Sequence, residues 1–271
     1  MQIQDKIAVV TGAAAGIGRA VAEQLARRGA RAVALVDRAP QVAEAAEYIN
    51  REAGGEVARA FCGDVCAPDF RAEVFAAMEK GGEVVRICVP AAGILRDALA
   101  VRVNRDSGAA QLYDADVFRT VLEVNLVHPV YWAVQMLARI AEARAAAGLK
   151  KWRPDQAIQG VSVLIGSVSS RGNRGQISYA CAKSGLNAAA KTLNAEGMFY
   201  GVQSKIVHPG MVNTAMLEQL PDGHFDAHFK PQIPLGRLIE PAEIAEAVAV
   251  LIENPAISGP LWADAGLAPM A

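Results

Sequence analysis

A glycine-rich turn between an apolar run and an amphipathic segment most constrains what this chain can fold into. Residues 7–10 are all apolar, which is typical of a strand buried on both faces of a parallel sheet. Residues 11–18 read Thr-Gly-Ala-Ala-Ala-Gly-Ile-Gly, and apolar residues then recur at helical spacing, at Ile17, Val21 and Leu25. This order predicts a strand, a tight turn and a helix.

The spacing of the three glycines predicts a dinucleotide-binding turn. Gly12 would permit the tight bend, Gly16 the close approach of a pyrophosphate, and Gly18 the close packing of helix against strand. The unpaired N–H groups at the helix N-terminus would then face the phosphates. The simpler alternative is that these glycines only turn the chain. The residues that follow the turn disfavour this alternative.

The end of the second predicted strand, residues 31–36, bears on the choice between NAD and NADP. Asp37 follows it, about 20 residues beyond the last turn glycine, where an acid accepts bonds from the adenosine ribose and repels a 2′-phosphate. Arg38 favours the opposite choice, because a guanidinium can bind that phosphate. Ala15 adds no second cation in the turn, so we expect NAD.

Alternating apolar runs and helical segments predict an α/β protein with a parallel sheet. Further strands are expected at 56–61, 84–89, 161–165, 204–207 and 261–263, and long helices at about 115–147 and about 178–198. Asp64 after the third strand could bond the adenine amino group or cap the next helix. The polar residues 104–116 indicate a surface excursion, and His128 is expected to be a packing residue.

Tyr179 and Lys183 have the spacing that places two side chains on one face of a helix. A fixed ammonium there would stabilise a tyrosinate and lower the pKa of the phenol toward the working pH, as a general base requires. A solvated helical pair would be the preferred interpretation for an isolated motif. Here the motif is not isolated, because the glycine turn would bind the dinucleotide beside which such a base works.

Charge and composition exclude several functional classes. Lys and Arg number 27 against 28 Asp and Glu, so no basic field predicts binding to nucleic acid or an anionic membrane. The four cysteines have no zinc or disulfide spacing, so no metal is expected and a reducing cytoplasmic location is predicted. No signal peptide is seen in the first residues, and charged and polar residues interrupt the apolar stretch 121–141.

Four motifs in order give the chain a resemblance to the classical short-chain dehydrogenase/reductase family, from Ile3 to about Gly266. They are the glycine turn, Asp64-Val65, the Tyr179/Lys183 pair and Pro209-Gly210-Met211-Val212-Asn213-Thr214. The resemblance implies one Rossmann-type doubly wound parallel sheet of about seven strands flanked by helices, in a single domain over residues 1–271. One departure is that Pro90-Ala91-Ala92-Gly93 stands where the family has Asn-Asn-Ala-Gly, so an amide that braces the cofactor loop is missing.

The resemblance also implies the site residues. The catalytic set would be Ser167, with Ser169 as the alternative, Tyr179, Lys183 and Asn125. Near the cofactor the resemblance places the turn glycines, Asp37, Arg38 and Asp64. The further residues that it places there are Ala15, Ile17, Val65, Ala92, Gly93, Tyr179, Lys183, Pro209, Gly210, Val212 and Thr214. A substrate lid is expected at about 211–233, where Met211, Met216, Leu217, Leu220 and Phe225 line a pocket or simply pack the loop.

The implied reaction is hydride transfer between NAD(H) and a secondary alcohol or ketone. Residues 94–99 resemble those of 3-oxoacyl carrier-protein reductases, so a 3-hydroxyacyl or 3-oxoacyl substrate is expected. Lys183 would also bond the nicotinamide ribose, Ser167 would hold the substrate oxygen and Asn125 would support the proton path. An NADPH-dependent ketoacyl reductase and a non-catalytic NAD-binding scaffold are the alternatives. A homo-oligomer, tetramer or dimer, is implied through the helices that carry Asn125 and Tyr179.

Overall fold

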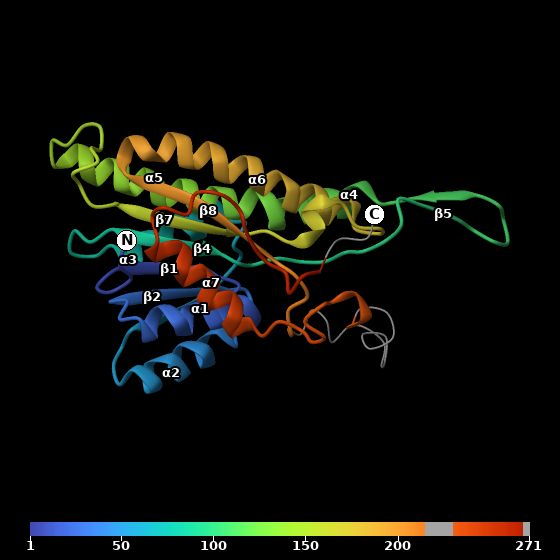
Figure 1. Cartoon of the computed structure of the whole chain (residues 1–271), viewed down its shortest axis with the longest axis horizontal. Helices are drawn as coiled ribbons and strands as arrows, with labels where there is room; N and C mark the ends of the chain where they lie inside the picture. The colour runs from blue at the N-terminus through green and yellow to red at the C-terminus, as the bar shows by residue number, and fades with distance from the viewer. Residues whose placement is uncertain (215–229, 268–271) are drawn as a thin grey trace.

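A sheet of parallel strands forms the centre of the computed structural model, which describes residues 1–214 and 230–267. Seven strands lie in the order β3-β2-β1-β4-β7-β8-β9 (Figure 1). Their bounds are β1 (Ile7–Thr11), β2 (Ala32–Asp37), β3 (Ala58–Cys62), β4 (Val85–Pro90), β7 (Gly160–Ile165), β8 (Val202–Pro209) and β9 (Leu261–Ala263). The strand burial explains the apolar runs, because β1 and β7 are buried along their whole length.

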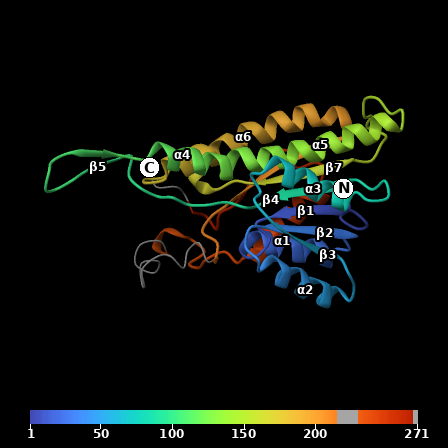
Figure 2. The same ribbon diagram turned by 180° about the vertical axis from the view of Figure 1, so that it is seen from behind.

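Helices cover both faces of this sheet (Figures 1 and 2). On one face pack α1 (Gly16–Arg27), α2 (Val42–Ala53) and α7 (Pro241–Glu253). On the other lie α3 (Pro68–Met78), α5 (His128–Ala146) and α6 (Ile177–Gly197), with α4 (Ala115–Leu122) leading into α5. Short 3₁₀ turns occupy Val168–Arg171, Met198–Tyr200 and Lys230–Gln232. The predicted fold class, a Rossmann-type doubly wound α/β sheet, is confirmed.

The strand order reverses between β1 and β4, because the chain runs outward through β2 and β3 and then returns to the other side of β1. In such sheets ligands bind at the carboxyl ends of the strands beside this reversal. The glycine turn leaves β1 at that edge, and α6 begins beyond the same end of β7. The topology therefore brings together two motifs that are far apart in the sequence.

The helix predicted at 115–147 is one long helix that contains a π-helical turn. Asp114 starts it, because its carboxylate accepts bonds from the N–H groups of Asp116 and Val117 at 2.8 and 2.9 Å. The π-helical turn (Glu123–Val127) then separates α4 from α5 and carries Asn125. Such turns inside helices are frequent at functional sites.

A two-stranded ribbon, β5 (Val101–Val103) and β6 (Ala110–Leu112), projects from the body beside α4 (Figure 1). The sequence predicted only a polar excursion over 104–116, so this ribbon was missed. Its strands are too short, and too uniformly exposed, to show the alternating pattern of a half-buried strand.

Candidate active site

The glycine turn lies against the carboxyl end of β4 and the segment that follows β8. Gly12 has a φ of +67°, and a Cβ there would lie 2.7 Å from Cα of Ala92. Gly16 has a φ of +56°, and its Cβ would lie 3.1 Å from Cγ2 of Thr214. Side chains at these two positions would press against Ala92 and Thr214, so both positions require glycine. The structure thus brings the predicted residues Gly12, Gly16, Ala92 and Thr214 to one place.

A buried hydrogen-bond network braces this turn where the family's asparagine pair is missing. The Thr11 hydroxyl accepts from the Ala92 N–H at 3.1 Å and lies 3.0 Å from Nε2 of His128. Nδ1 of His128 lies 2.8 Å from the Val124 carbonyl oxygen, so Nδ1 carries the proton and Nε2 accepts from Thr11. Burial lowers the pKa of His128 to about 4, which keeps this ring neutral.

His128 is buried and packs against Trp132, as predicted, but it also forms two hydrogen bonds that were not predicted. Its imidazole joins the end of β1 to the π-helical turn, and through Thr11 it supports the chain that replaces the asparagine pair. Residue type alone could not reveal this, because the partner hydroxyl lies 117 positions away.

Replacing His128 with leucine should destabilise the protein by about 1–3 kcal/mol, because the Thr11 hydroxyl and the Val124 carbonyl would be left buried without their partner. Urea unfolding measures the change. Thr11→Val should carry a similar cost, and the double variant should cost clearly less than the sum, because both changes remove one bond. Additive costs would show that the two residues act independently.

The carboxylate of Asp37 holds the glycine turn from the other side. Oδ2 accepts from the Ala14 N–H at 3.1 Å and Oδ1 from the Ala39 N–H at 3.0 Å. Each oxygen keeps further acceptor capacity. Arg38 is exposed and forms no ion pair with any residue that the structure describes. A fixed negative charge, and no fixed positive one, therefore stands beside the turn.

Asp64 and Val65 lie at the end of β3 in a local turn. Asp64 Oδ1 accepts from the Cys66 N–H at 2.9 Å and closes that turn, so Asp64 does not cap α3, whose N-cap is Ala67. Trp132 of α5 donates to the Val65 carbonyl oxygen at 2.8 Å and fixes this segment.

Asn125 clamps the chain that leaves β4. Its amide nitrogen donates to the carbonyl oxygens of Ile94 and Val121, both at 3.0 Å, and its oxygen accepts from the Ile94 N–H at 3.2 Å. A Cβ on Gly93 would lie 2.7 Å from that oxygen. The fully buried Asn125 is thus a positioning group for the segment after β4.

Ser167, Tyr179 and Lys183 converge beyond the end of β7. Ser167 begins the 3₁₀ turn there, and its hydroxyl accepts from the Ser169 N–H at 3.1 Å and lies near enough to the phenol to lower the pKa of Tyr179. The Nζ atom of Lys183 lies 5.5 Å from the centroid of the Tyr179 ring and donates to the Ile165 carbonyl oxygen at 2.8 Å. The Ser169 hydroxyl instead donates to Gln176 at 2.7 Å, so Ser167 is the serine that faces the phenol.

The electrostatics of this cluster differ from the prediction. Burial raises the pKa of Tyr179 to about 12, the nearby hydroxyl of Ser167 opposes this, and the charge of Asp97 adds to it. Burial also lowers the pKa of Lys183 to about 8. The predicted lowering of the tyrosine pKa is wrong in direction, because desolvation of the phenol dominates. Tyr179 is therefore a protonated phenol at neutral pH.

Asp97 belongs to the site and was missed by the sequence analysis. Its carboxylate accepts from Gln176 Nε2 at 2.7 Å, and Gln176 Oε1 accepts from Ser169 and Asn173. Burial raises the pKa of Asp97. This chain of bonds holds an acid close enough to Tyr179 to act on its charge, and nothing in the local sequence relates residue 97 to residue 176.

The carboxyl end of β8 completes the site. Nδ1 of His208 accepts from the Ser167 N–H at 3.1 Å, Nε2 lies 2.9 Å from Oδ1 of Asn187, and the ring stacks on Trp262 at 4.1 Å. Pro209 ends the strand, Gly210 packs against Asp264, and Val212 pairs with Ile239. Of the predicted lid, Met216, Leu217, Leu220 and Phe225 lie outside the described residues.

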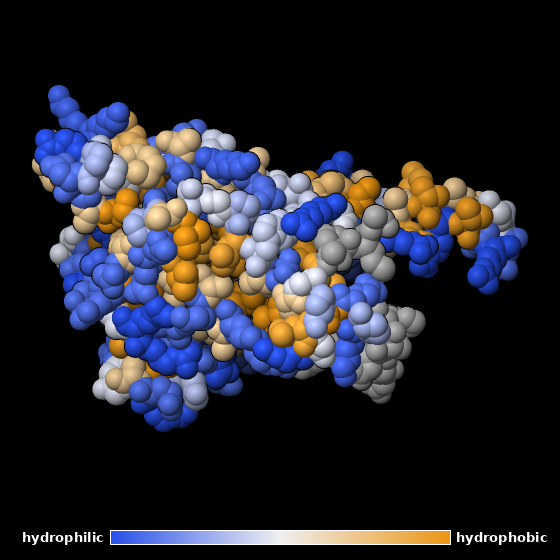
Figure 3. Space-filling view, in the orientation of Figure 1, coloured by the Kyte–Doolittle hydropathy of each residue, from blue (hydrophilic) through white to orange (hydrophobic). Residues whose placement is uncertain are grey.

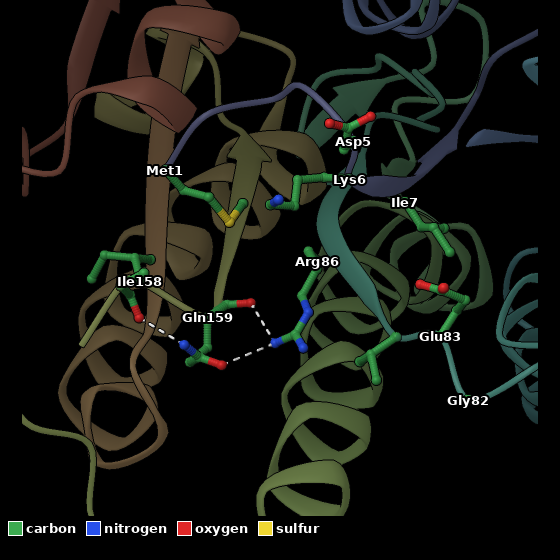
Figure 4. Close-up of a pocket in the computed structure, with 11 residues that line it drawn as sticks. Met1, Asp5, Lys6, Ile7, Gly82, Glu83, Arg86, Ile158 and Gln159 are labelled. Atoms are coloured by element: carbon green, nitrogen blue, oxygen red, sulfur yellow. Dashed lines mark hydrogen bonds between the residues drawn. The ribbon is translucent and has the colours of Figure 1, made fainter. Parts of the chain in front are cut away.

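A separate cavity of about 320 Å³ lies at the opposite edge of the sheet, where β1 and β4 begin (Figure 4). Arg86 points into it and donates to the carbonyl and side-chain oxygens of Gln159 at 3.0 and 3.2 Å. Lys6 and Glu83 also line it. It is remote from the predicted motifs, so we place the active site at the carboxyl edge.

The described part of the chain contains neither a candidate metal site nor a helix that could span a membrane. In residues 1–214 and 230–267 no group of three or more His, Cys, Asp and Glu side chains could hold a metal ion. No helix within the same ranges is long and apolar enough to cross a membrane.

Comparison with known proteins agrees with this geometry. The family model described as short chain dehydrogenase matches residues 6–224. A 3-oxoacyl-(acyl-carrier-protein) reductase of Mus musculus is 34% identical over 266 residues, which cover 97% of this chain and 98% of the relative. The enzyme of the same name from Vibrio cholerae is 33% identical, covering 93% and 91% of the two chains.

A solved structure is similar over the same extent. A protein of Agrobacterium tumefaciens, provisionally described as a gluconate dehydrogenase, superposes with a TM-score of 0.79 at 26% identity. The alignment covers 98% of this chain and 97% of that one.

Proposed function

This chain belongs to the short-chain dehydrogenase family, and we propose that it reduces the ketone of an uncharged 3-oxoacyl-type substrate with NADH. An oxidoreductase acting between an alcohol and a ketone, with NAD(P) as its cofactor, follows from the family. The choice of NADH and the substrate class are the proposal. The observation that carries it is the convergence of Ser167, Tyr179 and Lys183 beyond the end of β7, beside the glycine turn.

The protonation states favour reduction at neutral pH. A phenol whose pKa is raised to about 12 holds its proton and can donate it to a carbonyl oxygen. The hydroxyl of Ser167 can hold the same oxygen. The ammonium of Lys183, fixed by the Ile165 carbonyl, stabilises the negative charge that the phenol acquires as it gives up its proton.

The turn fits the pyrophosphate of a dinucleotide. Gly12 and Gly16 let the turn lie close to Ala92 and Thr214, and the N–H groups at the start of α1 have no side-chain cap. NAD(H), when bound, supplies or accepts the hydride. Asp37 would repel a 2′-phosphate, and Arg38 has no second cation near Ala15 to help it bind one.

The substrate class rests on the relatives' names and on Asp97. The relatives from Mus musculus and Vibrio cholerae are named 3-oxoacyl-(acyl-carrier-protein) reductases. A carboxylate held beside the phenol repels anionic substrates, so a sugar acid is a poorer fit here than an uncharged acyl ester. The lid predicted over residues 211–233, most of which lie outside the described residues, and the joining of copies through α5 and α6 belong to the same proposal.

The test is the oxidation of NADH in the presence of a short 3-oxoacyl thioester. We expect turnover with the thioester, at least about tenfold less with NADPH at equal concentration, and little with 2-ketogluconate. Faster turnover with NADPH would show that the chain is instead an NADPH-dependent ketoacyl reductase. Binding of NADH without turnover on any ketone would establish the non-catalytic scaffold.

Two variants localise the nucleotide preference. Asp37→Ala should improve kcat/KM for NADPH relative to NADH by about tenfold, because it removes the repulsion of the 2′-phosphate. Arg38→Ala should leave the NADH value nearly unchanged. Equal preference in wild type and Asp37→Ala would remove Asp37 from this role.

The reduction should also depend on the ionisation of Lys183. Its pKa of about 8 means that the ammonium is present at neutral pH and is lost as the pH rises through 8, whereas Tyr179 stays protonated until about 12. Turnover should therefore fall about tenfold per pH unit above 8.

Lys183→Arg keeps its charge at high pH and should lose that alkaline decline. Lys205 is the matched control, because burial lowers its pKa to about 8 as well, away from the site. Lys205→Arg should keep the decline. The opposite pattern in the two variants would assign the pH dependence to Lys205.

A further inference from the structure

The β5–β6 ribbon and its flanking residues, 99–112, form an arm that the rest of the described chain does not cover. Every residue of this arm is exposed, and Figure 3 shows it standing away from the body. Among its large apolar side chains the exposed fractions are 38% for Leu99, 51% for Val101, 60% for Val103 and 72% for Leu112. Such a concentration of exposed apolar side chains marks an interaction surface.

The pairing of the two strands gives the arm two chemically different faces. Val101 lies opposite Leu112 and Val103 opposite Ala110, so these four side chains share one face. Arg102 lies opposite Gln111 on the other face. The arm is therefore an amphipathic ribbon whose apolar face lacks the core that such a face normally covers.

The arm is structured despite this exposure. The Asn104 side chain accepts from the N–H groups of Asp106 and Ser107 at 2.9 and 3.0 Å and shapes the tip. Tyr113 fixes the stem, because its hydroxyl donates to the Arg96 carbonyl oxygen at 2.7 Å and lies 2.8 Å from the Ser178 hydroxyl. A two-stranded ribbon alone is marginal in water, so its apolar face needs a surface to pack against.

The same molecule exposes a surface that fits this face. Between Ile177 and Ala190 of α6 the only charged residue is Lys183, which is buried. The exposed side chains of this part of the helix are uncharged, and all except the isoleucine are small; they are Ile177, Cys181, Ser184 and Ala188, whereas the rest of α6 exposes Lys191 and Glu196. Figure 1 shows the arm continuing the helical layer to which α6 belongs. A second copy, turned by a two-fold rotation and joined through α5 and α6 as proposed above, would bring its arm alongside these exposed α6 residues.

The charges at the tip and on α4 agree with such an exchange. Arg105 at the tip and the exposed Glu123 at the end of α4 form no ion pair with any described residue, whereas the exposed Asp116 is already paired with Arg119 at 2.6 Å. An interface between two identical chains needs positively and negatively charged residues on each chain, because each residue of one copy meets a different residue of the other.

We propose that the β5–β6 arm packs its apolar face against a second copy of this chain. The stem also joins the start of α6, since the Ala98 N–H donates to the Gly175 carbonyl oxygen at 2.9 Å and Tyr113 contacts Ser178. Covering the arm therefore also holds the segment that precedes Tyr179.

The test compares two single charges on opposite faces of the arm. Val103→Glu places a carboxylate on the apolar face, and Gln111→Glu places one on the polar face of the same ribbon. Sedimentation velocity over a range of concentrations should show that Val103→Glu raises the dissociation constant of the assembly at least tenfold, whereas Gln111→Glu behaves as wild type. Circular dichroism should show both variants folded, because the arm lies outside the core.

Hydrogen exchange identifies the occupant. Protection of the arm amides should increase with protein concentration in the wild type and not in Val103→Glu. The proposal is overturned if Val103→Glu assembles like wild type, if wild type stays monomeric at about 100 µM, or if protection does not depend on concentration. Protection that appears only on adding another protein or lipid vesicles would assign the arm to that partner instead.

Discussion

Replacing Tyr179 with phenylalanine should reduce turnover by about 10²–10⁴-fold and leave the affinity for NADH within about twofold. The ring would remain in place beside Lys183, but the hydroxyl that gives its proton to the substrate oxygen would be gone. Steady-state kinetics and fluorescence titration with NADH measure the two quantities.

Tyr131 supplies a matched control for this substitution. It is a tyrosine of the same helical layer with half its surface exposed, and it lies outside the site. Tyr131→Phe should be indistinguishable from wild type. Equal losses in both variants would attribute the effect to the helical layer, and an active Tyr179→Phe would remove the central assignment.

Replacing Gly12 with alanine should have the second large effect, on both stability and binding. The new Cβ would meet the backbone of Ala92 at 2.7 Å, and neither the turn nor the end of β4 can yield without breaking the Thr11–Ala92 hydrogen bond. We expect a loss of more than about 3 kcal/mol in unfolding free energy and at least tenfold weaker NADH binding.

Gly54 separates the close contact from backbone strain. Its φ of +68° matches the +67° of Gly12, but no atom lies within 4 Å of the position of its Cβ. Gly54→Ala should therefore cost only about 1–2 kcal/mol, the strain of a left-handed alanine. Equal costs for the two variants, with unchanged NADH affinity, would show that close packing at Gly12 is unimportant.

The order of the elements was predictable because each has a strong local signal. The apolar run of β1, the largely apolar β7 and the helical spacing after Gly16 all reflect burial, which the sequence shows directly. The arm gave no such signal, because none of its residues is buried within the chain. A ribbon that packs on another molecule cannot be recognised from the core pattern of its own chain.

The candidate site was predictable in its residues and not in its electrostatics. Motif spacing located Ser167, Tyr179 and Lys183, which the fold brings together. The direction of the tyrosine pKa shift depends on burial and on Asp97, and neither can be read from the spacing of a tyrosine and a lysine. Likewise, His128 acts through Thr11, and only the fold brings them within 3.0 Å.

The central claim is that the phenol of Tyr179 donates the proton while a bound nicotinamide supplies hydride to the same carbonyl group. Mass spectrometry of the alcohol formed from a 3-oxoacyl thioester and NADH deuterated at the nicotinamide C4 tests it most directly. We predict deuterium on the carbinol carbon with wild type and none above background with Tyr179→Phe, although that variant still binds NADH. Unlabelled alcohol from wild type, or undiminished labelling with Tyr179→Phe, would contradict the account.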